Sequence, residues 1–540
     1  NDDNFNLQID PAEENTTPQV VDEDGNVKGL VAIVPGHVFG DLYRDVPFPG
    51  GIMNVTFAAG WSAGRIYEPF QAPLEDQFNK QEVDPQCTRN TADHVANPPQ
   101  NPFVKALLPV NQYDGALFKE RSPWYWADNI EVPTFLIEAW QDEQVGSRAT
   151  ELIERFDEDL EWRALFTNGD HGEYYGSHIL PHIDRFLRYH LETPIDPREI
   201  GTVTEEVSDP DPTPSPTPSP TATLPNGKPR KPKGKPSPTP SPTPTPTPSP
   251  STTTRDETQA EALARYNAEP PVQINYETGA GGNRVPAWSE TYASWPPPNQ
   301  EVWRLNMTAD GKLVDPDTAY DSAPSVTYRY EPGQSQQRGG YKLVGDLPDE
   351  TEPQWSEHPL LGTYAMFQTD VLDSDKVLAG PASVDMWVSS TAADTDFQVT
   401  VTEIRPESGK EVFVQQGWLR ASHRFLDEEQ STALRPYQTH APTDVLPLVP
   451  GLPEQVRLEI FPFAHAFRAG SKIRIYVEAP HVKPDLWGFA LLPVPAMNTI
   501  YTNATQPSSV ALPLLDGAEA KADALSCSLR NQPCRDLLVP

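Results

Sequence analysis

Two side chains with complementary acid and base chemistry follow apolar runs of the kind that form buried strands. Asp142 comes just after VPTFLIEAW (132–140), and His171 comes just after WRALFTNG (162–169). Catalytic groups of α/β sheets collect at the carboxyl ends of strands, so these two side chains are expected to meet there. A carboxylate that orients an imidazole lets the imidazole take the proton of a serine hydroxyl. The alternative is that both are ordinary loop residues with ordinary hydrogen bonds.

A serine nucleophile would have to precede them to give the chain order Ser…Asp…His. Residues 60–64 read Gly-Trp-Ser-Ala-Gly, a literal G-x-S-x-G centred on Ser62. A nucleophile elbow needs a strand that enters the serine and a helix that leaves it. MNVTFAA could pass for that strand, but RIYEPFQAP is a poor helix because Pro69 stops it. We therefore expect Ser62 to pack in a lid, with a nucleophilic role as the alternative.

A metal site is a weaker alternative. His178 and His182 lie four residues apart with His171 nearby, but no carboxylate or cysteine completes a known ligand spacing. A proline also lies between the first two histidines. Asp394 and Asp396 supply too few oxygens for calcium, which takes six to eight. The sequence predicts neither a metal nor a cofactor.

The amino-acid composition and net charge limit the kinds of partner that the protein can bind. The 540 residues carry 41 Lys and Arg against 77 Asp and Glu, a formal net charge of −36. Such a charge argues against nucleic-acid binding and against docking on anionic membranes. The first residues are polar and acidic and do not begin with methionine, which we interpret as a processed or truncated start.

Of the 62 prolines, 17 lie between Pro210 and Pro250, in a segment (208–254) that is rich in Pro, Thr and Ser. Proline fixes φ and lacks an amide donor, so this segment is expected to be a disordered, extended linker or insert. Its basic stretch KPRKPKGK is expected to solubilise the insert, with a protease-sensitive site or a contact for an acidic partner as the alternatives.

The patterns on the two sides of the linker differ. Before it, apolar runs at 30–35, 132–140 and 162–169 alternate with amphipathic stretches that start at Ser147 and at Ile179. That alternation predicts a parallel sheet with covering helices. After the linker, alternating β-branched runs separated by turn residues predict an antiparallel sandwich or jelly roll.

The positions of the three cysteines indicate the cellular compartment in which the protein works. Cys527 and Cys534 are close enough in sequence to form a local disulfide, which would leave Cys87 unmatched. Disulfides persist in oxidising compartments, so we expect a secreted or extracellular protein.

Several segments resemble the X-Pro dipeptidyl-peptidase and cocaine esterase (CocE/NonD) hydrolases. RSPWYWADNIEVPTFLIEAWQDEQVG (121–146) is similar to the family's segment with the catalytic aspartate, and Asp142 takes the acid position. NGDHGEYYG matches the place of the loop with the catalytic histidine and gives His171 the base position. DLYRDVPFPGGIMN resembles the segment just after the nucleophile helix. SWPPP, GPASVDMWVSSTAADTDFQVTVTEI, GWLRASHR and FRAGSKIRI resemble the non-catalytic jelly roll.

The resemblance implies a serine hydrolase of amides or esters, with release of N-terminal X-Pro dipeptides as one expected activity. The family's G-x-S-Y-x-G nucleophile motif precedes the segment matched by 30–35, and this chain has about thirty polar residues there without it. The implied serine therefore lies outside the chain, in a missing half or on a separate chain, and this chain alone is expected to be inactive.

The expected organisation has five parts. They are a polar segment (1–29), a partial α/β-hydrolase domain (30–207) with a cap (65–130), the linker (208–254), and a jelly-roll domain (268–540) with the Cys527/Cys534 tail. Expected partners are a peptide or small ester or amide substrate and, in an assembly, further copies of the chain. The competing interpretation is a non-catalytic secreted or surface scaffold that binds a partner through a fold derived from the hydrolase.

Overall fold

The computed structural model describes most of the two regions on either side of the linker. The described residues are 20–21, 27–62, 112–191, 200–207, 251–279, 285–318, 325–334, 355, 358–406, 409–480, 487–525, 529 and 532–537. They divide into two compact units, one of residues 1–191 with 269–540 and one of residues 192–268. Most of the predicted cap (65–130) and of the predicted linker lies outside the described residues. No described helix is long and apolar enough to cross a membrane.

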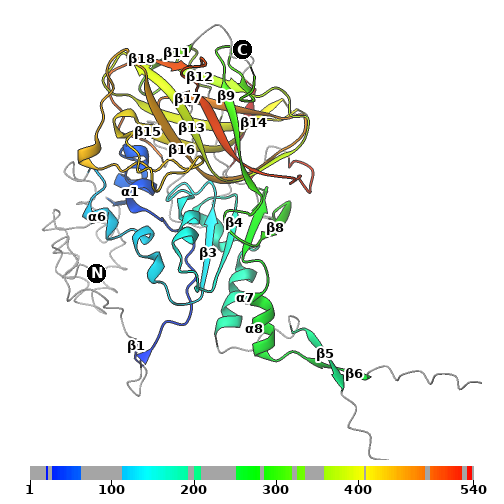
Figure 1. Cartoon of the computed structure of the whole chain (residues 1–540). Coiled ribbons are helices and arrows are strands. Elements are labelled where there is room, and N and C mark those ends of the chain that lie inside the picture. Colours follow the sequence, from blue (N-terminus) through cyan, green and yellow to red (C-terminus); the bar gives the residue numbers. More distant parts are fainter. Residues whose placement is uncertain are drawn as a thin grey trace, which may run out of the picture. The chain divides into compact units, whose positions relative to one another are not determined.

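A four-stranded sheet carries the segments that precede Asp142 and His171 (Figure 1). Its strand order is β3-β4-β7-β8, and the first three strands are parallel while β8 is antiparallel. The bounds are β3 (Thr134–Ala139), β4 (Trp162–Thr167), β7 (Val272–Tyr276) and β8 (Trp288–Tyr292). The first two strands agree with the runs predicted at 132–140 and 162–169. β7 and β8 lie after residue 268, where the expected jelly-roll region begins, and they complete this sheet.

The run predicted as a strand at 30–35 lies along the outer edge of β3 without forming a continuous strand. Ile33 and Gly36 form isolated parallel bridges to Thr134 and Ile137. The Ile33 and His37 amides donate to the carbonyls of Pro133 (2.9 Å) and Ile137 (2.8 Å). Pro35 stands between them and has no amide proton, so the ladder loses its middle bond there.

Helical segments flank the sheet. The helix expected from Ser147 is a 3₁₀ helix, η6 (Arg148–Arg155), because the Thr150 amide and hydroxyl both donate to the Ser147 carbonyl three residues earlier. The second predicted helix is present as α7 (Leu180–His190), which buries Phe186 against Phe135 of β3. The other short helices of this unit are α1 (Leu42–Asp45), η1 (Pro49–Gly51), α6 (Ala116–Lys119), η4 (Pro123–Tyr125), η5 (Ala127–Asn129), η7 (His171–Tyr175), η8 (Ala421–His423) and η9 (Pro442–Asp444).

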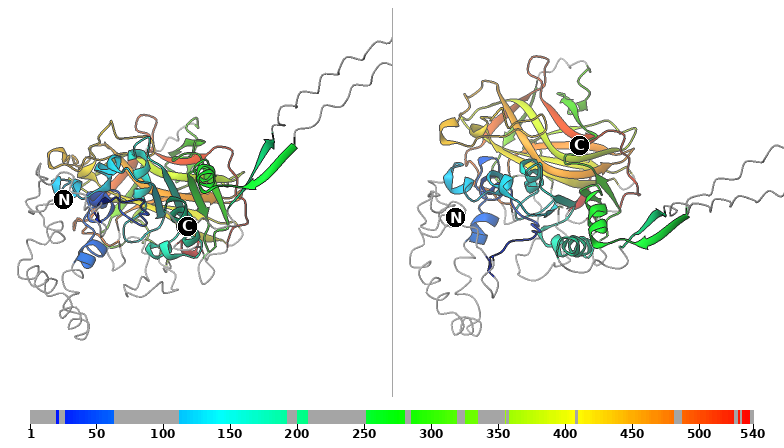
Figure 2. Two further views of the ribbon diagram at one scale, coloured as in Figure 1. Left: turned by 90° about the horizontal axis from the view of Figure 1, so that it is seen from below. Right: turned by 60° about the horizontal axis from the view of Figure 1, so that its bottom comes forward.

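Two antiparallel sheets build the C-terminal β domain, as the alternating pattern predicts. One has the order β10-β9-β19-β13-β18-β11, with β16 also pairing with β13, and the other has the order β12-β17-β14-β15-β20. Their bounds are β9 (Gln300–Met307), β10 (Leu313–Val314), β11 (Ser325–Tyr330), β12 (Tyr364–Gln368), β13 (Lys376–Ser390), β14 (Asp396–Ile404), β15 (Lys410–Arg420), β16 (Glu454–Phe467), β17 (Lys472–Glu478), β18 (Ala496–Tyr501), β19 (Ser509–Leu515) and β20 (Cys534–Asp536). Figure 2 shows these strands on one side of the unit and the α/β sheet on the other.

Residues 192–268 form a small unit of their own. Strands β5 (Thr202–Val207) and β6 (Ser251–Asp256) are antiparallel, and α8 (Gln259–Asn267) follows them. A capping box between Thr258 and Glu261 starts α8. The predicted linker is therefore too long at its end, because 251–254 belong to β6. The prolines stop at Pro250, and the β-branched threonines that follow favour a strand.

The remaining strand pair, β1 (Val20–Val21) with β2 (Val27–Lys28), lies near the start of the chain.

The β domain is bonded directly to the turn that follows β3. Gln415 of β15 donates from Nε2 to the Trp140 carbonyl at 2.6 Å, and Gln141 donates to the Val414 carbonyl at 3.1 Å. The Ser147 hydroxyl donates to the carbonyl of Pro462 on β16 at 2.6 Å. These side-chain to backbone bonds fix the turn between them to strands β15 and β16.

Gly417 of β15 allows β15 and β16 to approach closely. A Cβ at this position would overlap the backbone carbonyl of Glu459 on β16. Gly417→Ala should therefore destabilise the chain by about 1–3 kcal/mol or more, because backbone atoms rather than a flexible side chain must move. Chemical denaturation of the purified chain would measure the loss. Gly60→Ala is the matched control, since a Cβ there meets nothing within 4 Å. Equal midpoints for Gly417→Ala and the parent would contradict the close-packing account.

Candidate active site

Asp142 is buried in the turn after β3, with only 3% of its surface exposed. Its Oδ1 accepts the amides of Gln144 (2.7 Å) and Val145 (3.0 Å). Its Oδ2 accepts the Nδ1 proton of His171 at 2.8 Å. Gly146 closes the turn with φ +70°, and a Cβ there would come within 2.6 Å of the Phe461 ring. The carboxylate is therefore held by backbone donors on one oxygen and by the imidazole on the other.

His171 begins η7, directly after the loop that leaves β4. Its side chain is 34% exposed, in contrast to the fully buried side chain of Asp142. Because Nδ1 is engaged by the carboxylate, Nε2 is the ring nitrogen left to exchange a proton with a reacting group. The structure thus brings together the two side chains that the sequence placed at neighbouring strand ends.

The two partners shift each other's pKa in opposite directions. Burial by itself would raise the pKa of Asp142, but the His171 charge and hydrogen bond, with His37 nearby, hold it below its ordinary value. Burial by itself would lower the pKa of His171, but the Asp142 charge and hydrogen bond raise it to about 9. Both directions describe an ion pair between an ionised Asp142 and a protonated imidazole at neutral pH.

Two further carboxyl groups lie beside this pair. Glu138 of β3 is fully buried and accepts the Val38 amide at 3.0 Å, and burial raises its pKa well above its ordinary value. Glu143 accepts the His171 amide at 2.9 Å, and burial together with the Asp142 charge raises its pKa to about 8. Both groups therefore favour the protonated form near neutrality, and Asp142 is the largest source of the negative charge that raises the pKa of His171, to which Asp170 adds.

His37 is a residue of the site that the sequence reasoning missed. It follows the apolar run 30–35 by two residues, so the strand-end rule that selects Asp142 and His171 also applies to it. Its Nδ1 lies 2.7 Å from the His171 carbonyl and 3.8 Å from Asp142 Oδ2. Glu138 and Glu143 were missed too, because nothing in the sequence distinguishes them from other acidic residues beside a strand.

One group of side chains has the ligand geometry of a metal site. His37, Asp142 and His171 each offer a ligand atom, and these atoms lie within 4.8 Å of one another. Both histidines use Nδ1 as a proton donor, to the His171 carbonyl and to Asp142, so a metal would have to displace these protons. The hydrogen-bonded arrangement fits acid–base chemistry. Within the described ranges, His178 and His182 belong to no such group.

Ser62 does not contact the acid–base pair. It lies in a helical turn over 57–62 and is 7% exposed. The segment before it makes a single bridge, from Asn54 to Phe489, where an elbow would need a strand. None of the polar partners of Asp142 or His171 is Ser62. Its burial agrees with the expected packing role, although 63–111 lie outside the described residues.

Cys534 of β20 is disulfide-bonded. The predicted partner, Cys527, lies outside the described residues, as does Cys87.

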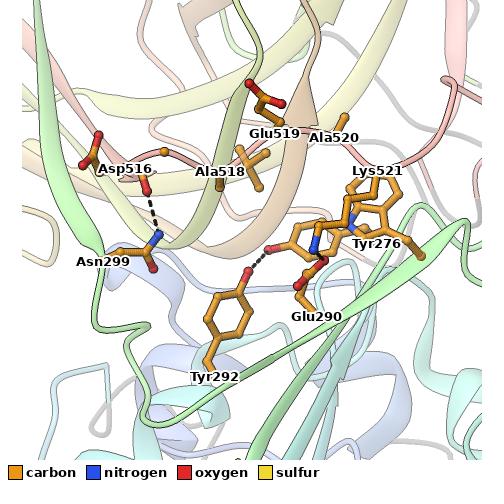
Figure 3. Close-up of a pocket in the computed structure, with 12 residues that line it drawn as sticks. Tyr276, Glu290, Tyr292, Asn299, Asp516, Ala518, Glu519, Ala520 and Lys521 are labelled. Carbon is orange, nitrogen blue, oxygen red and sulfur yellow. Dashed lines mark hydrogen bonds and ion pairs between the residues drawn. The ribbon is translucent and has the colours of Figure 1, made fainter.

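A cavity of about 360 Å³ lies elsewhere, between β8 and the residues that follow β19 (Figure 3). Its polar groups already bond to one another. The Tyr276 and Tyr292 hydroxyls are 3.1 Å apart, and Lys521 pairs with Glu290. Trp288 stacks on Tyr276 and faces the Arg468 guanidinium. Neither Asp142 nor His171 lines this cavity.

Comparison with known families identifies the family of the chain from independent information. The X-Pro dipeptidyl-peptidase (S15) family matches residues 16–173, a range that includes both Asp142 and His171. The C-terminal non-catalytic domain of X-Pro dipeptidyl-peptidase matches residues 264–511. The chain belongs to the X-Pro dipeptidyl-peptidase and CocE/NonD hydrolase family. The match confirms the resemblance carried by 121–146 and by the motifs of the β domain.

Related proteins and structures agree with that assignment. Two proteins, from Mycobacterium bovis and Mycobacterium tuberculosis, carry the provisional name of serine esterase and are each 30% identical over 147 residues. That stretch is 27% of this chain and 23% of each relative. A CocE/NonD family hydrolase from Staphylococcus aureus has a TM-score of 0.56 at 16% identity, covering 90% of this chain and 67% of its own. An aminopeptidase from a marine sediment archaeon, Thaumarchaeota archaeon, has a TM-score of 0.51 at 14% identity, covering 90% and 72%. The two structures establish the fold as an α/β-hydrolase domain with a C-terminal β domain.

The electrostatic coupling in the site can be measured in this chain without substrate. His171 should titrate near pH 9 by NMR of its imidazole, well above the ordinary value of about 6.5. Asp142→Asn removes the charge that stabilises the imidazolium, so the midpoint should fall toward the ordinary value or below it. His423, whose pKa burial lowers to about 4, is an internal control that should not move. A His171 midpoint unaffected by Asp142→Asn would contradict the coupling.

Proposed function

We propose that this chain is the C-terminal portion of a serine hydrolase that cleaves an amide or ester bond and, like an X-Pro dipeptidyl-peptidase, releases N-terminal X-Pro dipeptides. The observation that supports it best is the 2.8 Å bond between His171 Nδ1 and Asp142 Oδ2 at the ends of adjacent parallel strands. It leaves Nε2 on a partly exposed ring, as general acid–base catalysis requires.

In the proposed reaction, neutral His171 takes the hydroxyl proton of a serine on Nε2 as the serine oxygen bonds to the substrate carbonyl carbon. The imidazolium then gives that proton to the leaving amine or alkoxide as the bond to it breaks. A water molecule repeats the two steps, which releases the acid and restores the serine. Asp142 fixes the Nδ1–H tautomer and stabilises the imidazolium during both steps.

The nucleophile is proposed to lie outside these 540 residues. The chain contains no G-x-S-Y-x-G, and Ser62 makes no contact with His171 or Asp142. The serine would come from another segment of a longer protein or from a separate chain. On this proposal the chain by itself is inactive. Ser62 remains the alternative nucleophile, and a Ser62→Ala variant of the complete enzyme that keeps its activity would exclude it.

The β domain is proposed to be the family's jelly roll and to wall the substrate site. Its support is structural, since Gln415 and Ser147 link β15 and β16 to the turn that contains Asp142.

A secreted or extracellular location is proposed from the disulfide at Cys534, with Cys527 as its partner. The substrate would be a peptide or a small ester or amide. Nucleic acid and membrane surfaces are not proposed partners, given the charge of −36. Self-association into a homo-oligomer is left as a proposal for sedimentation experiments.

These observations do not favour a function as a non-catalytic scaffold. A scaffold would need the buried surfaces but not an ionised carboxylate bonded to a partly exposed imidazole. The family match over 16–173 also lies on the catalytic portion of X-Pro dipeptidyl-peptidases.

Substitution of either member of the pair tests the assignment in the complete enzyme. Asp142→Asn should lower kcat by several orders of magnitude because the imidazole loses its tautomer and its counter-charge, and His171→Ala should do the same by removing the base. Hydrolysis of p-nitrophenyl acetate and of Gly-Pro p-nitroanilide would report the loss. Asp128→Asn changes an exposed acid that is no polar partner of Asp142 or His171, and it serves as the control. Parent-like rates in Asp142→Asn or His171→Ala would refute the assignment.

The pH dependence of the complete enzyme should follow the protonation of His171. Only the neutral imidazole accepts a proton, and its pKa of about 9 means that kcat/KM should rise with pH through neutrality, reach half of its maximum near pH 9 and level off above it. Unfolding midpoints at each pH would separate this effect from loss of fold. A profile that is already flat at pH 6 would contradict a base of raised pKa.

A further inference from the structure

The backbone of His171 is held from both sides by side chains that lie next to Asp142. Its amide donates to Glu143 Oε2 at 2.9 Å, and its carbonyl accepts a bond from His37 Nδ1 at 2.7 Å. The imidazole of the same residue is bonded to Asp142 at 2.8 Å. Three side chains from two different strand ends thus fix one residue in a loop.

His37 is arranged for this one bond. The His171 carbonyl oxygen can only accept a hydrogen bond, so Nδ1 of His37 carries the ring proton and Nε2 is unprotonated. Nε2 is buried and has no hydrogen-bond partner. Burial lowers the pKa of His37, so the ring is neutral. The residue also has φ +51°, a left-handed conformation that non-glycine residues rarely adopt. A packing role alone would be served better by an apolar side chain, which leaves no ring nitrogen unpaired.

Glu143 supplies the opposite bond. It adjoins Asp142 in sequence and is 6% exposed. Its pKa of about 8 means that near neutrality it is a neutral carboxyl, whose oxygen still accepts the His171 amide without adding a second negative charge to the site. A buried acid that needs a proton to be tolerated is costly as a packing residue.

We propose that His37 and Glu143 are positioning residues that clamp the carbonyl and the amide of His171 and so hold its imidazole in line with Asp142. The inference rests on the proposed function, because it assigns the clamp to the general base of that reaction. Without the clamp, the loop after β4 can shift while the fold stays intact, and a displacement of about 1 Å at a reacting group costs on the order of 100-fold in rate.

Paired variants separate the clamp from general packing. His37→Phe keeps a planar ring but removes the donor, whereas His37→Asn keeps an N–H on the atom bonded to Cγ and tolerates positive φ. Glu143→Ala removes the acceptor, whereas Glu143→Gln keeps a carbonyl oxygen at the same reach. In the complete enzyme with p-nitrophenyl acetate, His37→Phe and Glu143→Ala should lower kcat about 10–100-fold with KM within about twofold. The Asn and Gln variants should stay within about threefold of the parent.

A second measurement uses this chain alone and requires no nucleophile. The Nδ1 proton of His171, bonded to Asp142, should give a downfield proton NMR resonance in the parent, in His37→Asn and in Glu143→Gln. It should broaden or move upfield in His37→Phe and Glu143→Ala. Phenylalanine is strained at the positive φ of position 37, so the His37→Phe variant can fail to fold. In that case the comparison of Glu143→Ala with Glu143→Gln distinguishes the clamp from general packing.

Three results would overturn the clamp. They are parent-like kcat and an unchanged resonance in both disruptive variants, equal losses in the conservative and disruptive variants, and a change in KM alone. Each would leave the proposed function standing as long as Asp142→Asn and His171→Ala abolish turnover. Turnover that survives those two substitutions would instead refute the proposed function itself.

Discussion

The bond between a fully buried carboxylate and a partly exposed imidazole is the constraint on which the rest of this site depends. Asp142 stays ionised in the interior because two backbone amides and His171 Nδ1–H surround it. An ionised carboxylate without such partners would cost several kcal/mol to bury. The parallel register of β3 and β4 makes the arrangement possible, because Ala139 and Thr167 are paired and both strands therefore end at the same level.

The β domain takes part in this arrangement although it contributes no group to the acid–base pair. The turn after β3 has its own hydrogen bonds, yet its flanking residues are bonded across to β15 and β16 through Gln415, Gln141 and Ser147. Gly417 lets those two strands lie close together, and Arg148 adds a buried ion pair to Glu459 of β16. The position of Asp142 thus depends on contacts more than 250 residues away in sequence, so the two parts of the unit act as one support.

Sequence reasoning found the parts of this site that obey local rules. The apolar runs predicted β3 and β4, and the strand-end rule then selected Asp142 and His171, which the structure brings to 2.8 Å. Local patterns failed where long-range pairing decides. The strand predicted at 30–35 is interrupted because Pro35 removes one ladder bond, a detail visible only once its neighbour is known. The pairing of β7 is also invisible to local patterns, since β7 pairs with a strand more than 100 residues earlier.

Two protonated glutamates lie buried beside the charged Asp142. Composition counts all three as acidic residues, so it gave little information about the site. Glu138, Asp142 and Glu143 appear in sequence as a run of acidic residues around one strand end, in a chain whose acids are abundant. In the fold, burial raises the pKa of Glu138 and Glu143, while hydrogen bonds and the imidazole lower that of Asp142. If all three were ionised, their repulsion would weaken the pair with His171 and add to the cost of burial. Neutral Glu138 and Glu143 can instead accept backbone amides, so one acidic residue supplies the charge while two others support the backbone around it.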